Sequence, residues 1–140
     1  MFIWVWSLKD HFKEFASANH LDPKLVEKAI ESSYTLRVCG DIANLLKHGR
    51  LKRSRSGKFP KLHRPRYQIP QEAIASLMFT EFAVTTNVSR PELVDISVPV
   101  EDNAGNEIGD ALILLRDAIY KWEETKNQLL QQVPTAPNTF

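Results

Sequence analysis

Three stretches of the chain carry apolar residues at helical spacing, and this pattern limits the possible fold more than any other feature. The first covers residues 7–18. The second runs from about 22 to 49, where an Asp-Pro pair suits a helix start and a glycine suits its end. The third, about 110–131, has the clearest apolar stripe, and Asp110 can cap it. We therefore expect most of the core to be helical.

The segment between the second and third helices predicts a smaller β element. Residues 50–70 are rich in Ser, Gly and Pro without periodicity, so we expect a loop, followed by a short helical segment through about Met78. Residues 79–88 and 94–100 alternate apolar and polar side chains, as strands do. Pro99 predicts an edge strand, and Gly105 suits a hairpin turn.

Together these patterns predict an α+β fold that is mainly α. It would be a helical bundle with a small antiparallel sheet or hairpin before the last helix. With 140 residues, the chain is long enough for one core, so we expect a single domain over residues 1–131 and a polar tail over 132–140.

The lone cysteine, Cys39, cannot form an intrachain disulfide, so we expect a cytoplasmic protein. The apolar start MFIWVWSL lacks basic residues and is too short for a signal sequence or a membrane span. We expect it to pack against the core or a second subunit, and we expect no membrane association. No cofactor motif and no zinc-ligand spacing is present, so we expect neither a cofactor nor a metal.

The net charge of +1 conceals a strong asymmetry. Residues 47–66 hold nine of the 18 Lys and Arg residues and no Asp or Glu. The rest of the chain holds nine basic residues against 17 acidic ones, a net charge of −8. Such a separation of charge favours a polyanionic partner.

A polar stripe lies on the second predicted helix. Arg37, Asp41, Asn44 and His48 are spaced i, i+4, i+7 and i+11, so they share one face. Histidine side chains titrate near about pH 6.5, which suits His48 for general acid–base catalysis. Asn44 could orient a phosphate or the imidazole, Arg37 and Lys47 could stabilise negative charge, and Asp41 could hold a cation in place. The structural alternative is an ordinary Arg37–Asp41 ion pair, with His48 capping the helix.

At these residues the sequence resembles the HEPN superfamily, whose members are helical, often dimeric, and include RNA-cleaving toxins. Their signature is an arginine, a polar residue that is often asparagine, and, a few residues later, a histidine that glycine often follows. Asn44, His48 and Gly49 match, whereas Ala43 stands at the place of the arginine.

The chain is also similar to uncharacterised HEPN-like proteins that carry an Asp-x-x-Asn-x-x-Lys-His pattern and a glycine-containing hairpin before a last helix with a tryptophan. The matching residues are Asp41, Asn44, Lys47, His48, Gly105 and Trp122. The resemblance implies a HEPN-like bundle. Together with the basic run at residues 47–66, it leads us to expect an RNA-binding protein, or a weak or degenerate metal-independent ribonuclease of a defence or toxin–antitoxin system.

The basic loop after His48 carries the candidate nucleic-acid ligands. Its cations could neutralise phosphates, and Phe59 and Tyr67 could stack on unpaired bases. The candidate cations are Arg50, Lys52, Arg53, Arg55, Lys58, Lys61, Arg64 and Arg66. Whether the chain is an enzyme stays open at this stage. In either case we expect a homodimer joined through its long helices. The alternative function is a non-catalytic interaction protein in which the polar stripe is structural.

Overall fold

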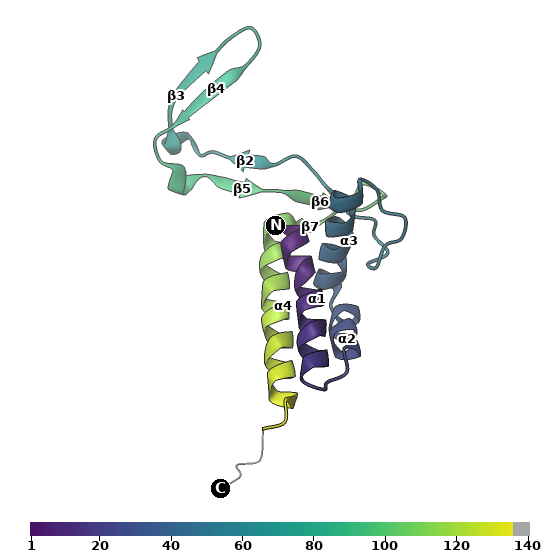
Figure 1. Ribbon diagram of the computed structural model, residues 1–140. Helices are drawn as coiled ribbons and strands as arrows, with labels where there is room; N and C mark the ends of the chain where they lie inside the picture. The colour runs from purple at the N-terminus through teal and green to yellow at the C-terminus, as the bar shows by residue number, and fades with distance from the viewer. Residues whose placement is uncertain (136–140) are drawn as a thin grey trace.

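The computed structural model describes residues 1–135, and its helices form an upright group beneath a β region (Figure 1). The helices are α1 (Phe2–Ala18), α2 (Lys24–Ser32), α3 (Tyr34–His48) and α4 (Ala111–Gln132). α1 packs against α3 and α4, and α2 packs against α3. Within residues 1–135, no helix is long and apolar enough to span a bilayer.

All the strands described lie between α3 and α4 and form three separate antiparallel sheets. A three-stranded sheet at one end of the helices has the order β1 (Lys61–Leu62), β6 (Pro99–Glu101), β7 (Glu107–Asp110). The other two sheets are two-stranded pairs: β2 (Arg66–Gln68) with β5 (Asp95–Ser97), and β3 (Ile74–Phe79) with β4 (Val84–Val88).

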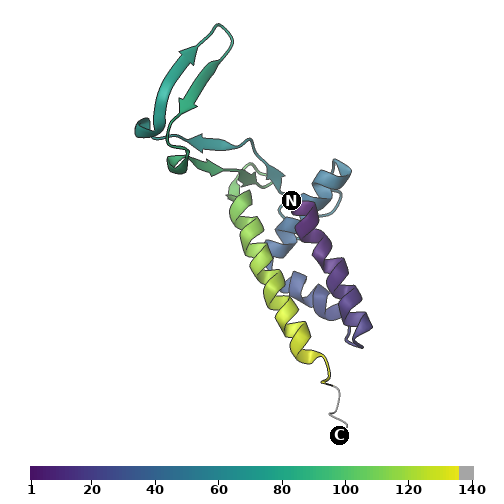
Figure 2. The same ribbon diagram turned by 60° about the vertical axis from the view of Figure 1, so that its left-hand side comes forward.

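The two strand pairs form an extended arm, which we call the β arm (residues 66–97). It leaves the top of the helices on the side where α4 lies, and it does so in both views (Figures 1 and 2). Short 3-10 helices at Gln71–Ala73 and Pro91–Leu93 separate the two pairs. The Ser89 N–H donates to the Ala73 carbonyl at 2.9 Å and joins the outgoing and returning segments of the arm there.

The predicted fold class is therefore wrong. We expected a mainly helical bundle with one small sheet or hairpin before the last helix. The structure instead inserts three small sheets between α3 and α4, two of them in an arm that extends away from the helices (Figure 1).

The predicted helix from 22 to 49 is also wrong, because it is two helices. Ser33 adopts an extended backbone (φ −113°, ψ 109°), and its Oγ accepts from the Leu36 N–H at 3.3 Å. Serine competes for backbone hydrogen bonds in this way, so it favours a helix start over a helix interior. The apolar periodicity continued across the break and concealed it.

Several strand predictions changed for local reasons. The expected strand 79–88 is a hairpin, because Thr80 folds a turn in which its Oγ1 accepts from the Ala83 N–H at 3.1 Å. The expected helical segment through Met78 reaches only Ala73, since pairing with β4 draws the following residues into β3. The expected loop 50–70 contains β1 and β2.

The expected strand 94–100 is divided at Val98, whose N–H donates to Asp110 Oδ2 at 2.7 Å. Pro99 lies in the central strand of its sheet, so the edge prediction is wrong. Proline is tolerated there because it is the first residue of β6. Its carbonyl accepts from the His63 N–H at 2.8 Å.

The ends of the outer helices follow the sequence more closely. α1 contains the expected helix but begins at Phe2, which brings the apolar N-terminus into the core. Ser7 lies inside α1, where its hydroxyl donates to the Trp4 carbonyl, so it caps nothing. Asp110 caps α4 as predicted, accepting from Leu112 N and Ile113 N. Gly105 takes a positive φ of 83° in the predicted hairpin turn between β6 and β7.

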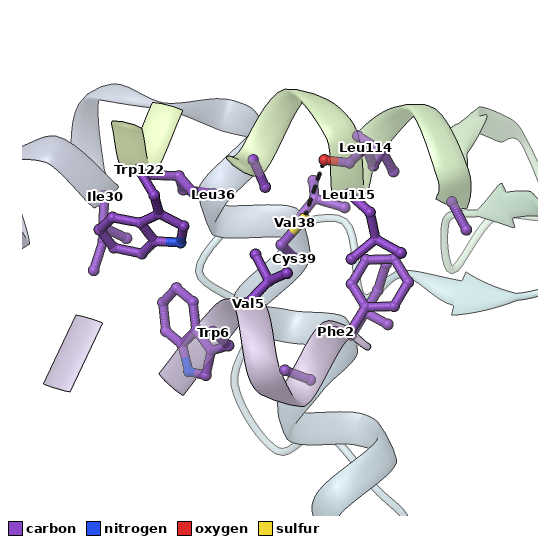
Figure 3. Close-up of a cluster of buried hydrophobic side chains, with 14 of the residues drawn as sticks. Phe2, Val5, Trp6, Ile30, Leu36, Val38, Cys39, Leu114, Leu115 and Trp122 are labelled. Carbon is purple, nitrogen blue, oxygen red and sulfur yellow. Dashed lines mark hydrogen bonds between the residues drawn. The ribbon is translucent and has the colours of Figure 1, made fainter. Parts of the chain in front are cut away.

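The core joins α1, α2, α3 and α4 (Figure 3). Phe2, Val5 and Trp6 enter it from α1, and Trp122 fills its α4 side. Cys39 lies in the middle of this cluster, with its Sγ–H donating to the Leu114 carbonyl at 3.7 Å. Burial raises the pKa of the Cys39 thiol to about 12, so it is a protonated packing group at neutral pH.

Gly40 sets how closely α1 approaches α3. A Cβ built at Gly40 would lie 2.7 Å from Cη2 of Trp6 and 2.9 Å from two further ring atoms. The close helix contact that an interior glycine suggested is therefore present, and its partner is an indole ring. Trp6 can lie flat against the α3 backbone only because no side chain stands there.

We predict that Gly40→Ala destabilises the fold by about 1–3 kcal/mol through this overlap. Helix propensity alone would give the opposite sign, by up to about 1 kcal/mol. Urea denaturation measures the difference. The control is the double variant Trp6→Leu with Gly40→Ala. In the Trp6→Leu background, adding Gly40→Ala should cost little stability, because the indole that it would overlap is gone. A more stable Gly40→Ala protein would contradict the packing described.

Candidate nucleic-acid interface

The candidate site begins where α3 ends. Gly49 adopts a left-handed conformation (φ 72°), and its N–H donates to the Leu45 carbonyl at 2.8 Å. Lys47 and His48 occupy the last turn, where positive charge is favourable beside free carbonyl groups. The helix therefore stops at His48, as the sequence predicted, and the basic loop starts from an exposed helix end.

Asp41 holds this loop against α3. Its side chain is buried, with 1% of its surface exposed, and it accepts four hydrogen bonds from residues 54–56. Oδ1 accepts from the Arg55 N–H at 2.8 Å. Oδ2 accepts from the Ser54 hydroxyl at 2.6 Å, the Ser56 hydroxyl at 2.7 Å and the Ser56 N–H at 3.0 Å. We call this arrangement the Asp41 clamp.

Further bonds continue the fold of the loop beyond the clamp. Ser54 Oγ also accepts from the Phe59 N–H at 3.2 Å, and the Lys58 carbonyl accepts from the Asn103 N–H at 3.0 Å. Gly57 takes a positive φ of 73°, which glycine adopts without strain. The loop that composition marked as irregular thus has a defined shape.

Arg55 packs back onto the helices. Its guanidinium carbon lies 5.3 Å from the centre of the Trp6 ring, within cation–π range, and Nη1 donates to Glu27 Oε2 at 3.1 Å. Glu27 also accepts a short hydrogen bond from Lys13. The bonds from Lys13 and Arg55 lower the pKa of Glu27, against the effect of partial burial. Arg55 therefore fixes the base of the loop and is only half available to a ligand.

A groove of about 530 Å³ opens between the end of α3 and the start of the loop. It is lined by Asn44, His48, Arg50, Leu51 and Lys52. This lining, which lies wholly within residues 1–135, includes two cations and a histidine but no carboxylate. The groove therefore offers positive charge and hydrogen-bond donors to an anion.

A second cavity of about 320 Å³ lies on the other side of Asn44, between α1 and α3. Its polar lining includes Lys9, Asp10, Lys47 and Arg55. Asp10 accepts from Lys9 Nζ at 2.6 Å, so the acid is already partnered. Asn44 thus stands between two basic hollows that together follow the surface around the end of α3.

The structure separates the predicted polar stripe into two parts. Asn44, Lys47 and His48 lie at the exposed end and border the two cavities. Asp41 is committed to the clamp, and in the part of the chain described it bonds neither Arg37 nor Lys47. The Arg37–Asp41 ion pair of the structural alternative is therefore not formed.

Arg37 lies about 16 Å from His48 along the helix axis, too far to share a small substrate with it. Its Nε is buried and has no hydrogen-bond partner within residues 1–135. The helical spacing placed both residues on one face, but a shared face does not bring residues eleven positions apart into one site.

The predicted cations are also spread over different environments. Arg50 and Lys52 line the groove, and Arg53 and Lys58 are exposed on the loop. Lys61, Arg64 and Arg66 lie farther along, in or beside β1 and β2. Arg66 donates to Glu107 at 3.1 Å, so one of these charges is paired.

Sequence reasoning missed the contribution of α1. Lys9 and Trp6 border the second cavity, although they are far from the basic run in sequence. The apolar periodicity of α1 could not predict this contribution, because periodicity does not show which other element packs against a given face of a helix. Nor did the sequence indicate that the Ser54 and Ser56 hydroxyls would bind Asp41.

No protein-family model, curated protein or solved structure matches the chain. The HEPN resemblance therefore stays a prediction from a short motif. Within residues 1–135, no three His, Cys, Asp or Glu side chains gather as metal ligands.

We predict that Asp41→Asn destabilises the protein by about 1–3 kcal/mol and loosens the basic loop. One carboxylate oxygen becomes an NH₂ group that faces backbone and hydroxyl donors, which leaves buried groups unpaired. Trypsin cleavage at residues 50–58, followed by mass spectrometry, should accelerate at least several-fold. Asp10→Asn, at an exposed carboxylate, is the matched control, and equal cleavage in both variants would argue against the clamp.

Proposed function

We propose that the protein binds single-stranded RNA in the groove at the end of α3. The observation that carries this proposal is the Asp41 clamp, which fixes a wholly basic loop beside Asn44 and His48. A buried carboxylate gives the loop its shape while the cations of the groove remain outward. A solvated loop of no function would not require this internal anchor.

The chemistry of the groove suits a phosphodiester backbone. Arg50 and Lys52 can neutralise phosphates and release counterions, and the Asn44 amide can donate to a phosphate oxygen. Lys47 extends the positive surface into the second cavity, where Lys9 is paired with Asp10. The two aromatics expected to stack on bases do not line the groove, since Tyr67 lies on β2 in the β arm and Phe59 is half-buried. RNA is the proposed ligand. The binding test below distinguishes a preference for RNA from equal affinity for DNA or for any polyanion.

His48 makes RNA cleavage a natural extension of the proposal. In a metal-independent mechanism, the imidazole takes the proton of a 2′-hydroxyl, and that oxygen attacks the adjacent phosphorus. A 2′,3′-cyclic phosphate forms, the P–O5′ bond breaks, and the departing 5′-oxygen takes up a proton. His48 is exposed in the groove one turn after Asn44. Ala43 supplies no charge at the arginine position of the resembled motif, so Arg50 and Lys52 are the nearest groove cations for the phosphate.

A second candidate function, a non-catalytic homodimer, has its own observation. The outward face of α4 exposes Leu112, Ile113, Ile119 and Tyr120, each by about 43–61% of its surface. An apolar stripe of this kind on a helix already packed on its other face favours a protein partner.

We predict that Arg50→Ala with Lys52→Ala weakens binding of a labelled single-stranded RNA at least tenfold. The slope of log affinity against log salt should fall by about 1.4, since each phosphate contact contributes about 0.7 for single strands. Arg116→Ala with Lys121→Ala, at exposed cations on α4, is the control of equal charge. Equal losses of RNA affinity in both double variants would show that only net charge matters, which would contradict binding in the groove. A DNA strand of the same sequence tests the preference for RNA.

We predict that His48→Ala abolishes any cleavage of a mixed RNA pool in EDTA but shifts the melting temperature by no more than a few degrees. The side chain is exposed, so its loss leaves the core unchanged. Gel analysis of end-labelled RNA, with a test for cyclic phosphate ends, gives the readout. Persistent cleavage by His48→Ala, or an intact RNA pool with the wild-type protein, would refute the catalytic role and leave the binding proposal to its own test.

A further inference from the structure

The β arm carries large apolar side chains that have nothing to pack against in one chain. Phe82 is 93% exposed at the hairpin tip, and Phe79 is 72% exposed. The full set on the arm is Tyr67, Leu77, Met78, Phe79, Phe82, Val84 and Ile96. A lone two-stranded hairpin is marginally stable in water, so an arm with this surface needs a partner to cover it.

The same chain carries a second uncovered apolar surface on α4. Leu112 and Ile119 are seven residues apart, as are Ile113 and Tyr120, so the four lie on one face. Leu115, Ala118 and Trp122 are buried in the core on the adjoining face of the helix. The outer stripe is therefore additional to what the monomer needs for its own packing.

The arm leaves the helices on the side where α4 lies. In both views its β3–β4 hairpin then turns upward, away from the helices (Figures 1 and 2). β3 and β4 contact chiefly each other, and the helices of the same chain leave them uncovered. The hairpin therefore stands clear of α4 of its own chain and is open to a second chain.

The β3 strand is longer than the apolar stripe on α4. The six residues of β3 extend about 20 Å, and the segment from Leu112 to Tyr120 rises about 12 Å along its helix. The hairpin can therefore cover the whole stripe.

We propose that the occupant is a second copy of this chain, with each β arm lying across the α4 stripe of the other copy. The single chain supplies both surfaces in equal number, and a two-fold axis satisfies both at once. Seven arm residues and four stripe residues, about half exposed and counted in both copies, offer on the order of 2,000 Å² of apolar surface. A stable interface needs about 1,200–2,000 Å² in total. The inference deepens the homodimer named above as the second candidate, and it does not depend on RNA binding.

The test compares the wild type with two double variants and one single variant by sedimentation equilibrium over a range of concentrations. Phe79→Ser with Phe82→Ser removes the arm surface, Ile113→Ser with Tyr120→Ser removes the stripe, and Leu46→Ser is the control at an exposed leucine on α3. The altered side chains are exposed, so the variants keep the monomer fold, which circular dichroism verifies. We expect a wild-type dimer, at least tenfold weaker dimerisation for both double variants, and no change for Leu46→Ser.

Cross-linking shows which surfaces meet. Phe82→Cys is prepared in one chain and Tyr120→Cys in a second chain with an affinity tag, since the native Cys39 is buried and unreactive. A short bis-maleimide should join the two different chains when they are mixed.

A monomeric wild type would overturn both the dimer and the arm inference. A dimer that survives the arm substitutions but not the stripe substitutions would keep the dimer and overturn the exchange of arms. A third chain that carries both Phe82→Cys and Tyr120→Cys and cross-links only within itself would show that the arm folds back, which also overturns it. RNA binding by the same variants is measured separately, so that a failure of the dimer proposal can be distinguished from a failure of the RNA-binding proposal.

Discussion

The organisation of the candidate site depends on one buried carboxylate. Asp41 accepts four hydrogen bonds from residues 54–56, and these bonds turn a run of like charges back onto α3. A carboxyl group can be buried at this depth only when its oxygens have hydrogen-bond partners, and here two serine hydroxyls and two backbone amides supply them. The basic residues repel one another, so without the clamp the loop would favour extended conformations. The helix end, His48 and the cations of the groove share one surface because this acid holds them together.

The packing of α1 supports the same arrangement from below. Trp6 lies against the backbone of α3 at Gly40 and carries the Arg55 guanidinium on its outer side. One indole therefore links the core to the base of the basic loop. The β arm extends in another direction, on the side of α4 (Figure 2). The chain thus offers a charged surface at the end of α3 and an apolar surface on α4 and the arm, which suit partners of different chemistry.

The sequence predicted helices where periodicity and caps agreed, as at α4 with Asp110, and it predicted the end of α3 at His48. It failed where a side chain redirected the backbone without breaking the apolar pattern, as Ser33 and Thr80 do. At the site, helical spacing placed Asn44 and His48 on one face, and both line the groove at the end of α3. It could not show that Asp41 would bind the serines of the loop, because that contact joins residues thirteen or more apart through a fold that local pattern does not encode.

The most direct test of this account is the amide spectrum of ¹⁵N-labelled full-length protein during titration with a short single-stranded RNA. The account predicts the largest shifts at Asn44, His48 and residues 50–52. The amides of Arg55 and Ser56 should stay protected from hydrogen exchange throughout, since the clamp remains closed when RNA binds. Rapid exchange at those two amides in the free protein, or shifts confined to the β arm, would contradict it.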